Sequence, residues 1–240
     1  DIFDTPSIEG PSGGGGNAQT YVRNKQFSGG ITYQPGGTSL LEIRLGWSNT
    51  EAGKDPNAVV QGEPGALEAY GISGLPTDPR VSGGLMTQQI TGFSELGRQA
   101  TNPQWQYPTV LNPKVNYSWL SGRHSLKTGY EFQNIKTQVQ DVNPLYGRDS
   151  YAGQFSRPAG AAANNLYNLG DFMLGLRSTY ALSNILVADL VQNMHFLYLQ
   201  DDWRVNDRLT LNAGLRYEYA TPWVEENNVL SNFDPATRSM

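Results

Sequence analysis

The stretch HFLYLQDDWRVNDRLTLNAGLRYEY, residues 195–219, decides the fold that the sequence predicts. From Leu209 onward a hydrophobic or aromatic residue falls at every second position, and polar residues or glycine fill the positions between them. This period of two is typical of a β-strand with one apolar and one polar face. The same alternation, broken only at Asp201, precedes the turn, so we predict a β-hairpin whose strands match face to face.

The matching faces predict the register, because a shift of one residue would exchange the two faces. A three-residue turn, residues 206–208, keeps the hydrophobic positions opposite one another, with Val205 opposite Leu209. It also sets Tyr198 opposite Arg216. A two-residue turn would break the match, so the pattern argues against it.

The same register sets Phe196 opposite Glu218 on the polar face. We expect the Arg216 guanidinium to stack on the Tyr198 ring and to reach Gln200 or a carboxylate of a neighbouring strand. The expected role of Arg216 is to order the wall of the sheet rather than to contact a ligand.

Asp201 falls on the hydrophobic face, where a carboxylate is costly if that face meets lipid. Either this strand end lies among lipid headgroups or a bulge turns the side chain inward, and both explanations stay open. With Asp202 it forms a lone acidic pair, which we interpret as part of a structural hydrogen-bond network rather than a calcium site.

Alternation predicts two further hairpins, near residues 26–48 and 114–139, beside the one near 194–219. In the first, the faces require a turn of odd length, for example residues 35–39. In the second they require an even length, which a four-residue turn at residues 121–124 supplies.

Long loops rich in proline and glycine are predicted near residues 49–113 and 140–192. Within the second, residues 170–176 are consistent with a short helix capped by Asn168 or with a buried strand. Short turns on one side of a sheet and long loops on the other are typical of outer-membrane barrels. Aromatic residues near strand ends would suit the interfacial girdles of such a barrel, namely Tyr33, Trp47, Trp119, Trp203 and Tyr219.

Composition excludes several classes of function. The net charge of −5 and the lack of a Lys/Arg cluster argue against nucleic-acid binding, and the absence of cysteine removes disulfides and thiolate chemistry. No apolar run approaches the roughly 20 residues of a transmembrane helix. The segment PSGGGG at residues 11–16 lacks the flanking pattern of a phosphate-binding loop, so we predict a flexible loop. The chain begins at Asp1 without a methionine, and we expect a piece of a longer protein or a processed product.

No catalytic, cofactor or metal site is predicted. The sequence contains neither a Gly-x-Ser-x-Gly nor a His-Glu-x-x-His motif, and His124 and His195 have no cysteine or acid at ligand spacing. We therefore expect that the protein is not an enzyme and needs no cofactor.

Three segments resemble TonB-dependent outer-membrane receptors, especially their Oar-like branch. They are YLQDDWRVNDRLTLNAGLRYEY at residues 198–219, WLSGRHSLKTGYEF at 119–132 and GDFMLGL at 170–176, and Pro222 and the NFDP tail at 232–235 agree. The resemblance covers about residues 115–240. It implies a 22-stranded barrel around a plug, which imports scarce or bulky nutrients with energy from the TonB complex.

We therefore predict an all-β fold, an antiparallel meander of about six strands from a large transmembrane β-barrel of the bacterial outer membrane. The predicted function is uptake of a nutrient such as a siderophore, oligosaccharide or peptide, with outer-membrane lipid, the plug, the TonB complex and a small ligand as partners. The alternatives are a β-rich surface protein used in adhesion or assembly and a soluble antiparallel sandwich. The residues expected to face the lumen are Tyr198, Gln200, Asp202, Arg204, Asn212, Arg216 and Glu218, and those expected to face lipid are Leu197, Leu199, Trp203, Leu211, Leu215 and Tyr217.

Overall fold

The computed structural model describes residues 18–231 and 234–239. The segment PSGGGG at 11–16 and the tail residues Asn232 and Phe233 lie outside these residues. The chain divides into two units. Over the described residues, the loop unit comprises 18–23, Glu51–Gln106 and Val139–Val187, and the strand unit comprises Asn24–Thr50, Tyr107–Gln138, 188–231 and 234–239.

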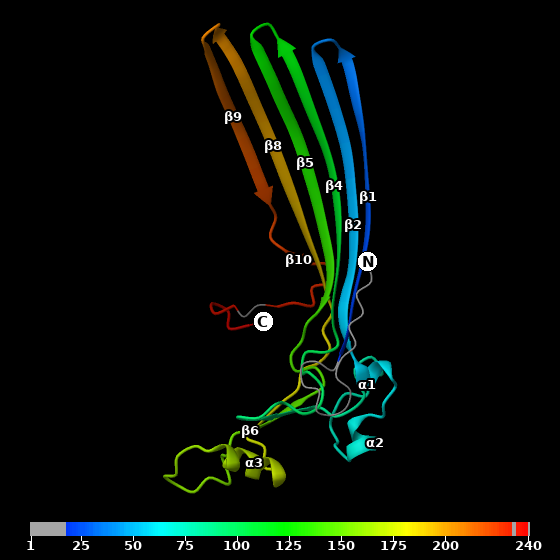
Figure 1. Cartoon of the computed structure of the whole chain (residues 1–240), viewed down its shortest axis with the longest axis vertical. Coiled ribbons are helices and arrows are strands. Elements are labelled where there is room, and N and C mark those ends of the chain that lie inside the picture. Colours follow the sequence, from blue (N-terminus) through cyan, green and yellow to red (C-terminus); the bar gives the residue numbers. More distant parts are fainter. Residues whose placement is uncertain (1–17, 232–233, 240) are drawn as a thin grey trace. The chain divides into compact units, whose positions relative to one another are not determined.

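The strand unit is built on an antiparallel meander, as the alternation predicted. Its sheet has the order β1-β2-β4-β5-β8, with β9 and the short β10 both paired to β8. Figure 1 shows the long strands side by side, with their tight turns at one end. The bounds are β1 Ala18–Gly36, β2 Ser39–Pro56, β4 Gln104–Ser121, β5 His124–Gln140, β8 Ala188–Asn206, β9 Leu209–Ala220 and β10 Val224–Glu225.

All three turns contain two residues, at positions 37–38, 122–123 and 207–208. The predictions of three residues at 206–208 and of an odd length around 35–39 were therefore wrong, and the second turn is even but shorter than predicted. Gly122 has a φ of 58°, which suits a tight turn because glycine lacks the Cβ that disfavours this conformation.

The predicted register of β8 and β9 is confirmed despite the shorter turn. Tyr198 pairs with Arg216 and Phe196 with Glu218, whereas Asn206, not Val205, pairs with Leu209. A register shift between Arg204 and Asn206 restores the match of the faces. Neither turn residue has the positive φ of the primed turns that suit two-residue hairpins, and a bulge adds the twist that such a turn lacks.

The partner strand of β8 is interrupted once, between β9 and β10. Met194 pairs with Ala220, and Val191 pairs with Val224, so three steps along β8 match four steps on the other side. Thr221 fills the gap, since its amide donates to the Asn193 carbonyl over 2.9 Å and its hydroxyl accepts from the Asn193 amide over 3.0 Å.

Glu225 in β10 is buried and fixes the chain that follows it. Its carboxylate accepts hydrogen bonds from the amides of Asp189, Asn227 and Val229 at 2.8–3.1 Å. Burial alone would raise the pKa of this carboxyl, but the hydrogen bonds outweigh that effect and hold the pKa below its ordinary value.

The loop unit contains a small fold that the sequence did not predict. Strand β3 pairs in parallel with β6, and β6 pairs antiparallel with β7, so residues from both predicted loops share one sheet. Its bounds are α1 Asn57–Val60, α2 Ala66–Tyr70, β3 Thr87–Ile90, β6 Arg148–Tyr151, α3 Asn165–Met173 and β7 Thr179–Ala181.

Helix α3 settles the choice left open for residues 170–176. The first part of this segment forms the C-terminal end of α3, which ends at Met173. The N-cap of the helix is Asn164, whose side chain accepts from the Leu166 amide over 2.9 Å. Asn168, the predicted cap, instead donates to the Thr91 carbonyl over 2.8 Å. None of the described helices is long and apolar enough to cross a membrane.

A buried arginine organises the loop unit. Arg98 is 2% exposed and donates to the carbonyls of Val81, Gly83 and Asn102, the last two at 2.9 and 3.0 Å. Its guanidinium carbon lies 4.2 Å from the centroid of the Tyr146 ring. Burial lowers the pKa of Arg98 to about 10, so the side chain stays charged at neutral pH. The surrounding core is formed by Ala66, Val81, Met86, Leu145 and Tyr146.

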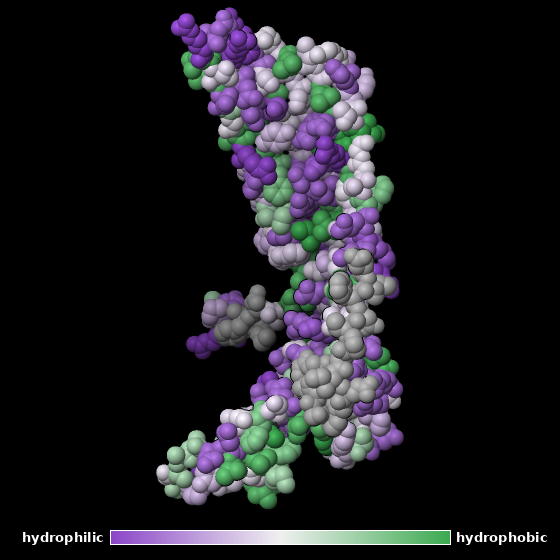
Figure 2. Space-filling view, viewed as in Figure 1, coloured by the Kyte–Doolittle hydropathy of each residue, from purple (hydrophilic) through white to green (hydrophobic). Residues whose placement is uncertain are grey.

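The sheet of the strand unit has one hydrophobic and one polar face. Figure 2 shows hydrophilic residues gathered over the middle of the long strands on the visible side. We call the side of the sheet that carries the alternating apolar residues the hydrophobic face. Its large side chains are exposed, including Phe27, Ile31, Ile43, Leu45, Trp47, Leu197, Leu199, Trp203, Leu211, Leu215 and Tyr217.

Candidate functional site

The polar face brings together the residues that the sequence predicted to line a lumen. Directly paired residues of an antiparallel ladder lie on the same face, and the ladder pairs Tyr198 with Arg216 and Asp202 with Asn212. The predicted lipid-facing set shares the other face, where Leu199 pairs with Leu215. The structure thus separates the two sets as predicted, and the medium that each face meets stays a prediction.

Tyr198 packs on a glycine of the adjacent strand. A Cβ at Gly129 would lie 2.5 Å from a ring carbon of Tyr198, so only glycine leaves room for the ring. The Tyr198 hydroxyl donates to the Asn116 side chain over 3.0 Å. These contacts connect β4, β5 and β8 across the polar face.

Arg216 has different partners from those predicted. Its guanidinium carbon lies 5.6 Å from the centroid of the Phe196 ring, and its Nε donates to the carboxylate of Glu218 on its own strand. The predicted stacking on Tyr198 was therefore wrong, because the Tyr198 ring covers Gly129 instead. The expected role of Arg216 in ordering the wall of the sheet stays a prediction.

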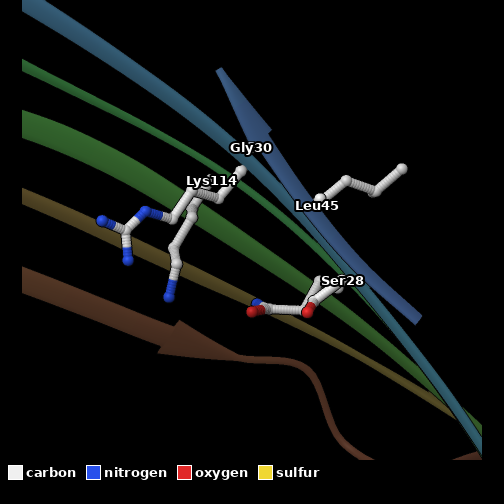
Figure 3. A pocket seen from close by; sticks show the side chains of 8 residues that line it. Ser28, Gly30, Leu45 and Lys114 are labelled. Carbon is white, nitrogen blue, oxygen red and sulfur yellow. The ribbon is translucent and has the colours of Figure 1, made fainter. Parts of the chain in front are cut away.

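A shallow groove of about 460 Å³ lies where β1, β2 and β4 adjoin, at the end of the strand order opposite to β8 and β9. Figure 3 shows Lys114 and Ser28 pointing to one side of the sheet and Leu45 pointing to the opposite side. The groove therefore belongs to the polar face. Its lining residues are Ser28, Gly29, Gly30, Arg44, Leu45, Gly46, Asn112 and Lys114.

Two cations dominate the charge of the groove. Arg44 donates one hydrogen bond to Glu42 over 3.0 Å, and its side chain remains 58% exposed. Lys114 interacts electrostatically with Glu131. Glu131 already accepts hydrogen bonds from Asn112, at 2.8 Å, and from Gln133, at 2.9 Å. The alternation places Ser28, Arg44 and Lys114 on the polar side of their strands, but it does not indicate that the three strands lie side by side and bring these residues to one groove.

On the hydrophobic face, an aromatic cluster lies toward the loop end of β8. His195 pairs with Tyr219, and their ring centroids are 6.2 Å apart. The Tyr130 hydroxyl lies 2.7 Å from His195 Nδ1, and the Phe132 ring centroid is 5.1 Å from that of His195. We call Tyr130, Phe132, His195 and Tyr219 the loop-side cluster.

A second cluster on this face lies toward the turns and provides the Asp201 carboxylate with a partner. His124 stacks on Trp203 with ring centroids 5.4 Å apart, and His124 Nδ1 lies 2.7 Å from an Asp201 carboxylate oxygen. The ladder is continuous through Asp201, so no bulge turns it inward. We call His124, Asp201 and Trp203 the turn-side cluster. Asp202 is on the polar face, where it accepts from Gln200 over 3.2 Å, so the acidic pair does not form a joint site.

Comparison with known proteins identifies the kind of chain. The family model described as an outer membrane beta barrel domain matches residues 1–240. The chain belongs to this family. No curated protein matches. Among solved structures, the chain is similar to the outer membrane transporter YddB from Escherichia coli, with a TM-score of 0.43 and 13% identity over 85% of this chain. The chain spans 22% of that transporter's length.

As an outer membrane beta barrel domain, the chain resides in the bacterial outer membrane. A transmembrane β-strand needs about 9–11 residues. Strands β1 and β8 contain 19 residues each, and β2 and β4 contain 18 each. The long strands therefore extend well beyond what a single crossing requires.

Over residues 18–231 and 234–239, no group of three or more His, Asp or Glu side chains is placed to hold a metal ion.

Proposed function

We propose that the chain is a segment of a TonB-dependent outer-membrane receptor of the Oar-like branch, which takes up a nutrient such as a siderophore, oligosaccharide or peptide. The division of the sheet into two faces carries this proposal. Leu215 is 75% exposed and Leu199 is 56% exposed on one face, while the other face is covered by hydrogen-bonded polar residues. An open apolar surface of this kind is suited to lipid, and the polar face is suited to a wet lumen.

The two aromatic clusters support an assignment of depth. His195 of the loop-side cluster and Trp203 of the turn-side cluster are on the same strand. Eight strand residues span about 27 Å, or about 21 Å after a tilt of about 40°, close to the roughly 25 Å apolar band of an outer-membrane barrel. In this placement Asp201 lies near the headgroups, where its pairing with His124 reduces the cost of a carboxylate.

The proposal assigns partners by position. Outer-membrane lipid covers the hydrophobic face, and the plug of the parent receptor and a small ligand meet the polar face. The TonB complex acts on the parent protein. The proposal assigns no catalytic residue, cofactor or nucleic-acid partner to the chain.

Co-purification tests the TonB part of the proposal. The full-length protein that carries this segment, extracted from outer membranes in detergent, should be retained by the immobilised C-terminal domain of TonB. A truncation that removes the segment N-terminal to the plug should abolish retention. Equal retention of both forms, or of neither, would contradict a TonB-dependent mechanism.

Adhesion or assembly is the second candidate function, favoured by helix α3. Leu166, Met173 and Leu174 of the loop unit are 69–74% exposed, and their spacing places them on one side of the helix. Such a surface is suited to another protein. Cells that express the protein should then aggregate or adhere, and replacing the three residues with serine should remove that behaviour. Transport without any aggregation would exclude this candidate.

A further inference from the structure

We propose that the groove at Arg44 and Lys114 binds an oxyanion, a carboxylate or phosphate group, of the solute that the receptor takes up. This inference rests on the proposed function, because it places the polar face in the path of a solute. It adds a chemical class of ligand and a position for its recognition.

The donors converge from three strands. Ser28 is in β1, Arg44 in β2 and Lys114 in β4, and all three line the same groove. A guanidinium provides a planar fork of N–H donors, an ammonium provides a compact charge, and a hydroxyl adds a further donor. This combination matches the oxygens of a carboxylate or phosphate, and charge-assisted hydrogen bonds of this kind are the strong ones.

Lys114 is the less fully paired of the two groove cations, since Arg44 already donates to Glu42 over 3.0 Å. Arg216 and Glu218 pair within one strand, and Lys136 donates to Glu226 over 2.6 Å. Lys114, in contrast, donates no hydrogen bond to any residue that the structure describes, although it feels the charge of Glu131. A cation without a bonded acid can receive the charge of a ligand.

Glycine keeps the floor of the groove open. A Cβ at Gly30 would lie 3.2 Å from Arg44 Cγ, so a larger residue would displace the arginine stem. A Cβ at Gly46 would lie 3.7 Å from the Asn112 carbonyl, and both residues line the groove. The backbone of β1 and β2 therefore stays accessible beneath the two cations.

Binding of inorganic phosphate to the full-length protein in detergent tests the inference, with broadening of the phosphorus NMR line as the readout. The double variant Arg44→Gln/Lys114→Gln should weaken phosphate binding about tenfold or more, as expected from the loss of charged hydrogen bonds. Lys127→Gln is the matched control, because Lys127 shares the polar face and does not line the groove. The variant Arg44→Lys keeps the charge and should retain part of the binding.

Each outcome decides between explanations. Loss in the double variant with retention in the control supports the oxyanion site, and equal binding by all variants overturns it. No binding by the natural protein also overturns it; if the melting temperature then falls in the double variant alone, a carboxylate of the parent protein occupies the groove. Retention by the immobilised C-terminal domain of TonB is assayed in parallel on the same protein, so that failure of the uptake proposal, seen as loss of that retention, is distinguished from failure of the oxyanion site.

Discussion

The strand unit leaves the large hydrophobic side chains of one sheet face exposed, whereas the loop unit buries a small hydrophobic core. Leu215 is 75% exposed, while Met86 and Leu145 of the loop unit are 1% exposed. The strand unit is held by its ladder and by the medium that covers it, and the loop unit by a small core around buried polar groups. In the proposed placement, lipid stabilises one unit and the exclusion of water stabilises the other.

The largest expected effect is on membrane insertion of the strand unit, with the loop unit left intact. Leu215 pairs with Leu199, midway between the two aromatic clusters, so Leu215→Arg should cost about 2–4 kcal/mol of insertion free energy. Leu211 pairs with Trp203 near the turn-side cluster, and Leu211→Arg should cost about 1 kcal/mol or less. Folding titrations into lipid vesicles measure both, with Asn212→Arg on the polar face as the control. Normal insertion of the Leu215 variant would refute the lipid-facing assignment.

The second prediction breaks the loop unit alone. Arg98→Met leaves the carbonyls of Val81, Gly83 and Asn102 without their donor, at an expected cost of about 3 kcal/mol to the local stability of the unit. Protease added to intact cells should cut residues 49–113 faster in this variant, while vesicle insertion stays unchanged. Arg80→Met, which removes an exposed partner of Asp78, is the control. Loss of insertion with Arg98→Met would mean that the two units are not independent in stability.

A smaller effect, dependent on pH, is expected at Asp171. This buried carboxylate accepts from the amides of Ser156 and Phe155 at 2.8 and 3.2 Å. Burial alone would raise its pKa, but the hydrogen bonds outweigh burial and hold the pKa below the ordinary 3.8. Its stabilising contribution is therefore present above pH 3.8 and is lost as the pH falls through the lower, folded value.

Pepsin digestion across this acidic range measures the Asp171 effect. Cleavage within residues 140–192 should accelerate as the pH falls in the natural protein, and Asp171→Asn should be cleaved readily and with less dependence on pH. Glu68→Gln, in α2, serves as the control. Identical pH profiles for the natural protein and the Asn variant would rule out this role of the carboxylate.

The smallest expected effect sharpens the boundary of the hydrophobic face. His124→Phe keeps an aromatic ring against Trp203 but removes the partner of Asp201, at a cost of about 1 kcal/mol. The double variant His124→Phe/Asp201→Ala should recover most of that loss, and a double-mutant cycle in vesicle folding measures the coupling. Additive effects of the two changes would show that the pair contributes nothing at this depth.

The sequence predicted the strand unit well because alternation is a local signal. The faces and the pairing of Tyr198 with Arg216 follow from it, whereas the two-residue turns do not. The outer-membrane location was predicted instead from the short turns on one side of the sheet and the long loops on the other. A bulge at Val205 changes the count of residues without changing the composition, so parity alone could not reveal it. Hydrophobic alternation also carries no information on which polar neighbours bond, which explains the error over the partner of Arg216.

The loop unit escaped prediction for a different reason. Its sheet joins β3 and β6, which are separated by the whole of β4 and β5, and its core depends on Arg98, a residue type that is rarely buried. No period in the sequence marks either feature. The groove at Arg44 and Lys114 is similar, because Ser28, Arg44 and Lys114 come from three strands whose lateral order must be known first.

The register shifts of the sheet have an evolutionary consequence. At Val205 and again between Ala220 and Val224, the chain already accommodates one residue more than its partner strand requires. Elsewhere in the ladder a single-residue insertion or deletion would exchange the hydrophobic and polar faces of everything up to the next turn. Length variation among descendants of this gene should therefore accumulate at these two joints, while the ladder between them changes only by substitution.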